Sequence, residues 1–196
     1  MSLSALVALA ATAVLLVALV VLHLLPTGLS PAHNPVSQYA LTPFKIGYVI
    51  AALAAAVAGA ASALALAPVG RAGVTVVLLW IFAVARALIP LFPMDPPGGA
   101  PSPRGRAHRL LAIAAFATVT AAAFTAISPL MAGGFRWLGG ISMAAGIVMA
   151  IGAIGVLVGA SSPQLRRVFG LTERLIYLGF IAWFAALAIG LLAPHV

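Results

Sequence analysis

Apolar residues fill the chain in long uninterrupted runs, and polar residues are confined to the stretches between these runs. A helix needs about 20 consecutive apolar residues to cross the hydrocarbon core of a bilayer. The alternation of apolar and polar residues that is typical of membrane-spanning strands is absent, so helices are favoured over strands. We predict six membrane-spanning helices: Leu3–Leu25, Phe44–Ala67, Val74–Phe92, Ala107–Met131, Leu138–Ala160 and Arg174–Leu192.

The connections between these segments are short enough for each helix to run antiparallel to the next. The simplest architecture is an all-α polytopic membrane protein, a single domain over residues 1–196 that forms one bundle of six transmembrane helices. With six spans, both termini lie on the same side of the membrane. The N-terminal run lacks a basic leader and is too long for a cleaved signal peptide, so we interpret it as the first span.

Composition supports this class. Of the 196 residues, 64% are hydrophobic and 6% are charged, and the mean hydropathy is +1.23. A soluble domain has roughly 45–50% apolar and about 25% charged residues, so a water-soluble fold is excluded. Cysteine is absent, which excludes disulfides and thiolate metal sites. The net charge of +8 is explained by arginines at lipid head groups, so we expect the bilayer of the cell inner membrane, and no nucleic acid, as partner.

Polar residues gather in the first, third and fifth connections, which six spans must place on one membrane face. Among charged residues, the second and fourth connections carry only Arg71 and Arg136. The odd-numbered connections and their flanks carry His33, Asn34, Ser37, Gln38, Tyr39, Lys45, Asp95, Arg104, Arg106, His108, Arg109, Arg166, Arg167, Glu173 and Arg174.

Two interpretations of this face compete. Lysine and arginine crowd cytoplasmic loops, so the face could simply be cytoplasmic. Alternatively, the cations bind an anion such as a lipid phosphate. The arginines of the fifth connection lack suitable polar neighbours and fit the first interpretation. For Arg106 and Arg109, which flank His108, both interpretations stay open.

Arg86 is an ionisable residue inside the third span. Burial of an arginine at the bilayer centre costs on the order of 2.5–3.5 kcal/mol on insertion scales. Its side chain either extends to the interface or faces the bundle interior, where it would pair with Asp95 or Glu173. We expect the interior placement and include Arg86 among the candidate binding residues.

The first and third connections supply the remaining candidates. The stretch AHNPVSQYA contains His33, Asn34, Ser37 and Tyr39, and Ser37 is placed to cap a short helix after the turn at Asn34. Asp95 lies where the third span ends, and His108 opens the fourth.

These residue types permit two chemistries. Histidine and aspartate can bind zinc or another divalent ion, with a hydroxyl orienting a water. Ser37, His108 and Asp95 could instead perform acid–base chemistry of the serine-hydrolase kind. A polar site is favoured over isolated interfacial residues, and a metal in it is not favoured.

Small residues mark two faces for close helix packing. Ala51, Ala55, Gly59 and Ala63 recur at every fourth position, and Gly155 and Gly159 form a GxxxG step. Such spacing lets backbones approach closely in lipid. These faces pack either within the bundle or between subunits of a homo-oligomer.

Three motifs, NPVSQYA, FPMDPPG and RGRAHRLLAIAAF, resemble in order the signature of a bacterial six-spanning membrane family called domain of unknown function 998. Many members of that family carry an acidic residue where this chain has Gln38, and this departure weakens a metal site. The resemblance covers essentially the whole chain. The positions that it marks are Asn34, Pro35, Ser37, Tyr39, Pro93, Asp95, Arg106, His108 and Arg109.

The layout is also distantly similar to the six-span Frag1/DRAM/Sfk1 group, and more loosely to zinc-dependent intramembrane hydrolases related to alkaline ceramidase. The family resemblance implies a first connection outside the cytoplasm, whereas the Lys/Arg count places it inside, so the orientation stays open.

The sequence thus predicts a polar pocket at one interface that binds or modifies a lipid head group or a small anionic molecule. In a hydrolytic version, His108 is base or ligand with Asp95 as its partner, and Arg106 and Arg109 bind the anion. Ser37 and His33 complete the wall. The alternative is a non-catalytic transporter, with helices broken at the bilayer midplane, or a membrane partner subunit, with an exposed groove of small residues.

Overall fold

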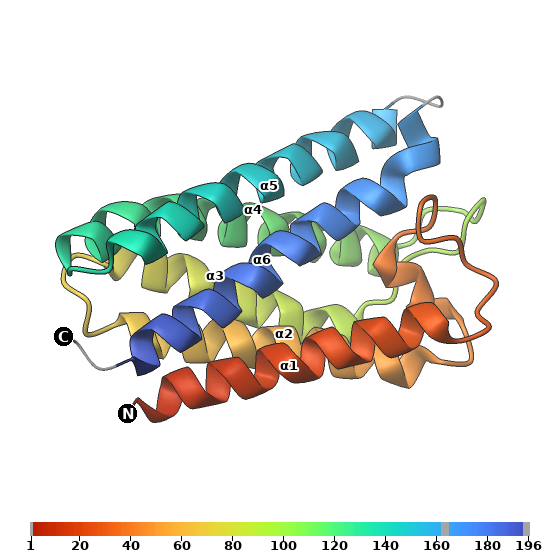
Figure 1. Cartoon of the computed structure of the whole chain (residues 1–196). Coiled ribbons are helices and arrows are strands. Elements are labelled where there is room, and N and C mark those ends of the chain that lie inside the picture. Colours follow the sequence, from red (N-terminus) through yellow and green to blue (C-terminus); the bar gives the residue numbers. More distant parts are fainter. Residues whose placement is uncertain (1, 162–164, 194–196) are drawn as a thin grey trace.

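The computed structural model describes residues 2–161 and 165–193, and this part of the chain folds as helices without strands (Figure 1). Within these described residues, six helices are long and apolar enough to cross a membrane, with η2 continuing α3, which confirms the predicted fold class. The long helices are α1 (Leu3–Leu24), α2 (Lys45–Leu66), α3 (Gly73–Leu88), α4 (Pro103–Ala132), α5 (Arg136–Ser161) and α6 (Phe169–Leu192). The same part of the chain also contains three short 3-10 helices: η1 (Val36–Leu41), η2 (Ile89–Leu91) and η3 (Leu165–Val168).

Two helices begin earlier than predicted by a full turn or more, namely α4 and α6. The α4 helix starts at Pro103 rather than Ala107, because Ser102 caps it by accepting a 3.0 Å hydrogen bond from the Gly105 N–H, and proline suits the first helical position. The α6 helix starts at Phe169 rather than Arg174. An apolar pattern detects the part of a helix that lies in lipid and misses a polar first turn.

Helices that are consecutive in the sequence pack against each other, and α1 also packs against α6, which closes the bundle (Figure 1). The core contains interlocked rings: Phe82 of α3 packs edge-on against Phe180 and Phe184 of α6. Nearby, the buried Trp183 donates a 2.8 Å hydrogen bond to Ser142 of α5. This aromatic core ties α6 to α3 and α5.

The small-residue faces pack inside the bundle. Ala51, Ala55 and Ala63 are buried, and a Cβ at Gly59 would overlap the ring of Phe82 on α3. On α5, a Cβ at Gly155 would overlap Thr172 of α6. These faces therefore pack within the bundle of a single chain, which is one of the two arrangements that the sequence left open.

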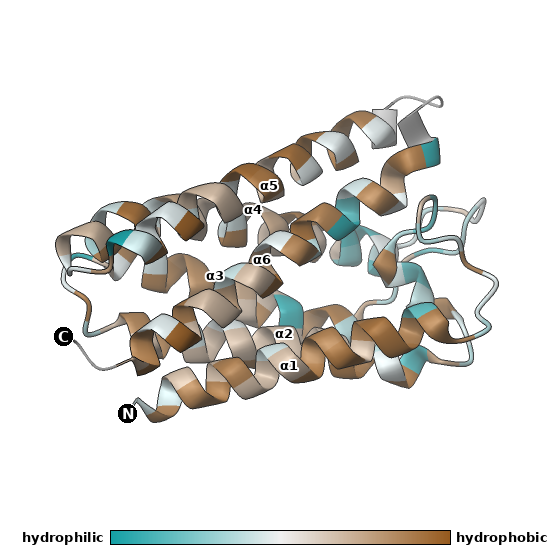
Figure 2. Cartoon of the chain, in the orientation of Figure 1, coloured by the Kyte–Doolittle hydropathy of each residue, from teal (hydrophilic) through white to brown (hydrophobic). Residues whose placement is uncertain are grey.

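The two ends of the bundle differ in polarity. The start of α1 and the end of α6 lie at one end, and the segments before α2 and before α4 lie at the other, with the start of α6 (Figure 1). Hydrophilic residues concentrate at this second end (Figure 2). The predicted gathering of the odd-numbered connections is therefore confirmed; the side chain of Arg166 and residues 162–164 lie outside the described part of the chain.

Candidate functional site

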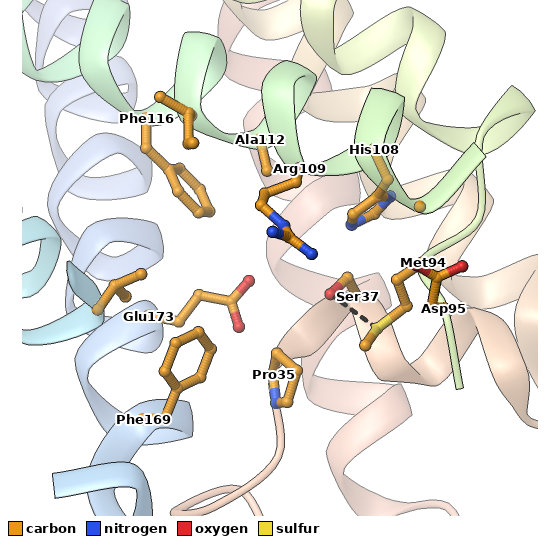
Figure 3. Close-up of a pocket in the computed structure, with 13 residues that line it drawn as sticks. Pro35, Ser37, Met94, Asp95, His108, Arg109, Ala112, Phe116, Phe169 and Glu173 are labelled. Atoms are coloured by element: carbon orange, nitrogen blue, oxygen red, sulfur yellow. Dashed lines mark hydrogen bonds between the residues drawn. The ribbon is translucent and has the colours of Figure 1, made fainter. Parts of the chain in front are cut away.

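A cavity of about 270 Å³ lies at the polar end of the bundle, between α4, α6, η1 and the segment before α4 (Figure 3). Its wall combines polar side chains with apolar and aromatic ones from three long helices. The lining residues are Pro35, Ser37, Met94, Asp95, Gly105, His108, Arg109, Ala112, Ile113, Phe116, Val156, Phe169 and Glu173.

Asp95 is held by the capping residue of α4. Its carboxylate accepts hydrogen bonds from the Ser102 hydroxyl at 2.6 Å and from the Ser102 N–H at 3.2 Å. These bonds hold the pKa of Asp95 below its usual range, with a smaller contribution from the charges of Arg109 and Arg106. The carboxylate lies so close to Gly105 that a Cβ there would overlap it. Asp95 therefore organises the start of α4.

His108 is buried, with 7% of its surface exposed, and its ring is oriented by the chain that precedes α4. Its Nδ1 lies 2.8 Å from the carbonyl oxygen of Phe92. Because a carbonyl only accepts, Nδ1 carries the proton, and Nε2 holds the lone pair of the neutral ring. In the described part of the chain, Nε2 has no hydrogen-bond partner, and it is not fully buried. It is thus free to accept a proton or a hydrogen bond.

Ser37 does not cap η1, contrary to our prediction. Pro35 precedes η1, and no side chain caps it. Instead the Ser37 hydroxyl donates to the sulfur of Met94 at 3.3 Å. Among the described residues, no hydrogen bond joins Ser37, Asp95 and His108. All three line the same cavity, but each has a different partner, so they do not form a linked acid–base triad.

The three candidate arginines are placed differently. Arg109 extends its guanidinium into the cavity (Figure 3). Arg106, on the same helix and exposed like Arg109, does not line the cavity. Arg86 is 2% exposed and lies in the bundle interior, as expected.

The expected ion pair of Arg86 with Asp95 or Glu173 is not formed in the described part of the chain. Its Nη1 donates instead to the hydroxyl of Tyr177 at 3.0 Å, and the guanidinium lies 5.3 Å from the centre of that ring. The Nε and Nη2 groups of Arg86 are occluded and have no partner among the described residues. Arg86 does not line the cavity.

The remaining candidates build the first connection. Asn34 accepts a hydrogen bond from the Ser30 N–H and donates one to Gln38, at 2.7 and 3.0 Å. His33 is exposed and pairs with the Ser30 hydroxyl. Tyr39 is buried, with its ring 5.5 Å from that of His23. None of the three lines the cavity.

Glu173 is the ionisable residue of the described cavity wall that the sequence did not single out as a candidate site residue. It is 5% exposed, its Oε2 accepts a 2.7 Å hydrogen bond from the Val36 N–H, and its carboxylate points into the cavity (Figure 3). The apolar pattern placed it in a connection before the sixth span, whereas the early start of α6 makes it a helical residue. The sequence offered one signal for Glu173, namely that it is one of only two acidic residues in the chain.

The described residues contain no group of three or more His, Asp or Glu side chains that could hold a metal ion. The two carboxylates of the cavity wall already have other partners: Asp95 accepts from Ser102, and Glu173 accepts from the Val36 N–H.

Comparison with known proteins identifies one relationship. The family model described as "Protein of unknown function (DUF998)" matches residues 9–190. No curated protein and no solved structure gives a significant match, and nothing in these comparisons supports the distant similarity to the Frag1/DRAM/Sfk1 group. Because the match spans nearly all of the chain and its six apolar helices, this multi-pass membrane protein belongs to the DUF998 family.

Proposed function

We propose that this protein, as a component of the bacterial inner membrane, binds the phosphate of a lipid head group in the cavity at the polar end of the bundle. The observation that carries the proposal is the guanidinium of Arg109, which lies in the cavity and forms no ion pair with a described carboxylate (Figure 3). A guanidinium presents a planar fork of donors that matches a phosphate.

The part of the cavity wall that follows Arg109 along α4 is apolar and suits the acyl chain of a lipid. Ala112, Ile113 and Phe116 follow Arg109 at the third, fourth and seventh positions, so all four side chains lie along one face of α4. Ile113 is 53% exposed in the isolated chain, which leaves this stripe open toward the lipid. An amphiphile would place its phosphate at Arg109 and its hydrocarbon along the stripe.

The decisive test is lipid retention measured by native mass spectrometry of the protein in nanodiscs. Arg109→Gln should weaken binding of phosphatidylglycerol about tenfold, because a hydrogen bond to a charged group contributes about 1.5–3 kcal/mol. Arg104→Gln is the matched control, since Arg104 is an exposed arginine of the same helix that does not line the cavity. Equal losses in both variants, or no loss in Arg109→Gln, would refute the proposal.

Hydrolysis of the bound head group is a second candidate, favoured by the orientation of His108. With Nδ1 bonded to the Phe92 carbonyl, Nε2 is available as a general base toward the cavity. Head-group release from a labelled phospholipid tests this activity. Loss of release in His108→Gln, with lipid binding retained, supports it; no release by the unmodified protein contradicts it.

A transporter is less well supported. Transporters of the inverted-repeat kind form their sites where helices are interrupted at the bilayer midplane. In the described part of the chain, the only proline inside a long helix is Pro129, in the last turn of α4 and at the end opposite the cavity.

A further inference from the structure

Glu173 provides a second charge on the cavity wall, on a different helix from Arg109. Figure 3 shows its carboxylate extending from α6 toward the guanidinium of Arg109 on α4. The Val36 N–H occupies Oε2. Oε1 has no hydrogen-bond partner among the described residues, and it is not fully buried. One carboxylate oxygen is therefore available to a ligand.

The two charges do not neutralise each other directly, because no ion pair joins Glu173 and Arg109 in the described part of the chain. The other nearby cations are also directed elsewhere. Arg174 donates to His23 and to the carbonyl oxygens of Asn34 and Gly170. Arg86 donates to Tyr177. In the part of the chain that the structure describes, the charges of Arg174 and Arg86 act on Glu173 without any hydrogen bond to it. A buried carboxylate that lacks a direct ion pair is unfavourable, so a ligand that brings a cation to Glu173 would be stabilised there.

We infer that the cavity takes a zwitterionic head group, with the phosphate at Arg109 and an ammonium group at Glu173. This inference rests on the proposed function and specifies the class of lipid. Phe116 and Phe169 lie on either side of the Glu173 carboxylate (Figure 3). Aromatic faces attract cations, so the carboxylate and the two rings form a subsite for an ammonium group.

Asp95 does not serve as this subsite, although it is the other carboxylate on the wall. Both of its oxygens accept hydrogen bonds from Ser102, at 2.6 and 3.2 Å. The two acidic residues of the chain thus have different tasks: Asp95 holds the start of α4, and Glu173 faces the ligand.

The experiment compares phosphatidylethanolamine, phosphatidylcholine and phosphatidylglycerol with identical acyl chains, competing for the full-length protein in native mass spectrometry. We expect a zwitterionic lipid to be retained over phosphatidylglycerol. Glu173→Gln should reduce this preference about tenfold while phosphatidylglycerol binding persists. The glutamine carbonyl can still accept from the Val36 N–H, so the first connection is kept in place.

Asp95→Asn is the matched control and should leave the preference unchanged, since the asparagine oxygen keeps one of the two hydrogen bonds from Ser102 and Asp95 is not part of the ammonium subsite. If phosphatidylethanolamine is retained more strongly than phosphatidylcholine, the subsite binds a primary ammonium through hydrogen bonds. If both are retained equally, the subsite recognises the positive charge alone.

The inference is overturned if phosphatidylglycerol competes equally or if Glu173→Gln leaves the preference intact. When Arg109→Gln weakens all three lipids but Glu173→Gln changes nothing, only the inference fails. When Arg109→Gln has no effect on any lipid, the proposed function fails with it.

Discussion

Glu173 Oε2 accepts a 2.7 Å hydrogen bond from the backbone N–H of Val36, a residue 137 positions earlier in the chain. This bond fastens the first connection to α6. Two neighbouring contacts reinforce it: Leu171 N–H donates to the Ala32 carbonyl at 3.1 Å, and Arg174 donates to the Asn34 carbonyl at 2.8 Å. The cavity wall formed by Pro35 and Ser37 thus depends on the first turns of α6.

Glu173→Ala should destabilise the fold because it leaves the Val36 N–H buried without an acceptor. The loss of unfolding free energy should be about 1–3 kcal/mol, which thermal unfolding in detergent measures. Glu173→Gln keeps the acceptor and should lose clearly less. Equal melting temperatures for the two variants would show that the bond does not hold the connection.

Gly105→Ala should disturb the start of α4, because the added Cβ would overlap the Asp95 carboxylate. Such overpacking costs about 1–3 kcal/mol. Gly140→Ala is the control: it lies within α5, and a Cβ there meets no atom within 4 Å. Thermal unfolding should therefore separate the two variants, and a Gly105→Ala protein as stable as Gly140→Ala would contradict the close packing.

The stability of the start of α4 should depend on acid pH through Asp95. The pKa of this carboxyl is lowered from 3.8 in the folded chain, mainly by its hydrogen bonds from Ser102. A lowered pKa means that the contribution is fully present above the unfolded value and is lost as pH falls through the folded value.

The free energies of unfolding of the unmodified protein and of Asp95→Asn should therefore differ by a constant amount down to about pH 5. Below the ordinary pKa of an aspartate the two values should converge. A difference that is unchanged at low pH, or that appears only above neutral pH, would exclude this assignment.

Arg86 and Tyr177 should respond to substitution in opposite directions. Tyr177→Phe removes the one hydrogen bond that Arg86 makes among the described residues and should cost about 1–3 kcal/mol. Arg86→Met removes a buried charge that has two unpartnered donor groups, and should be neutral or stabilise the protein by about 1–4 kcal/mol. Denaturation in detergent checks both values. Strong destabilisation by Arg86→Met would instead reveal a further partner for the guanidinium.

Several features of the site follow from the sequence and several do not. The number of spans already places four candidate residues at the same end of the bundle, since the odd-numbered connections must lie on one membrane face. These residues are Ser37, Asp95, His108 and Arg109. The individual partners do not follow, because Ser37 bonds to Met94 and Asp95 to Ser102 through local geometry. Arg86 shows the same division: its burial was expected, whereas its pairing with Tyr177 depends on how α3 and α6 pack.

The sequence alone determined the six apolar helices, their antiparallel order and the polar end, because lipid requires long apolar segments with internally satisfied backbones. The tertiary structure alone decided which polar groups face one cavity. Phe116 of α4 packs edge-on against Tyr177 of α6, and glycines of α5 allow close approach to both helices, so these contacts set the separation and rotation of α4 and α6. That rotation directs Arg109 and Glu173 into the same cavity, and neither residue's own segment specifies it.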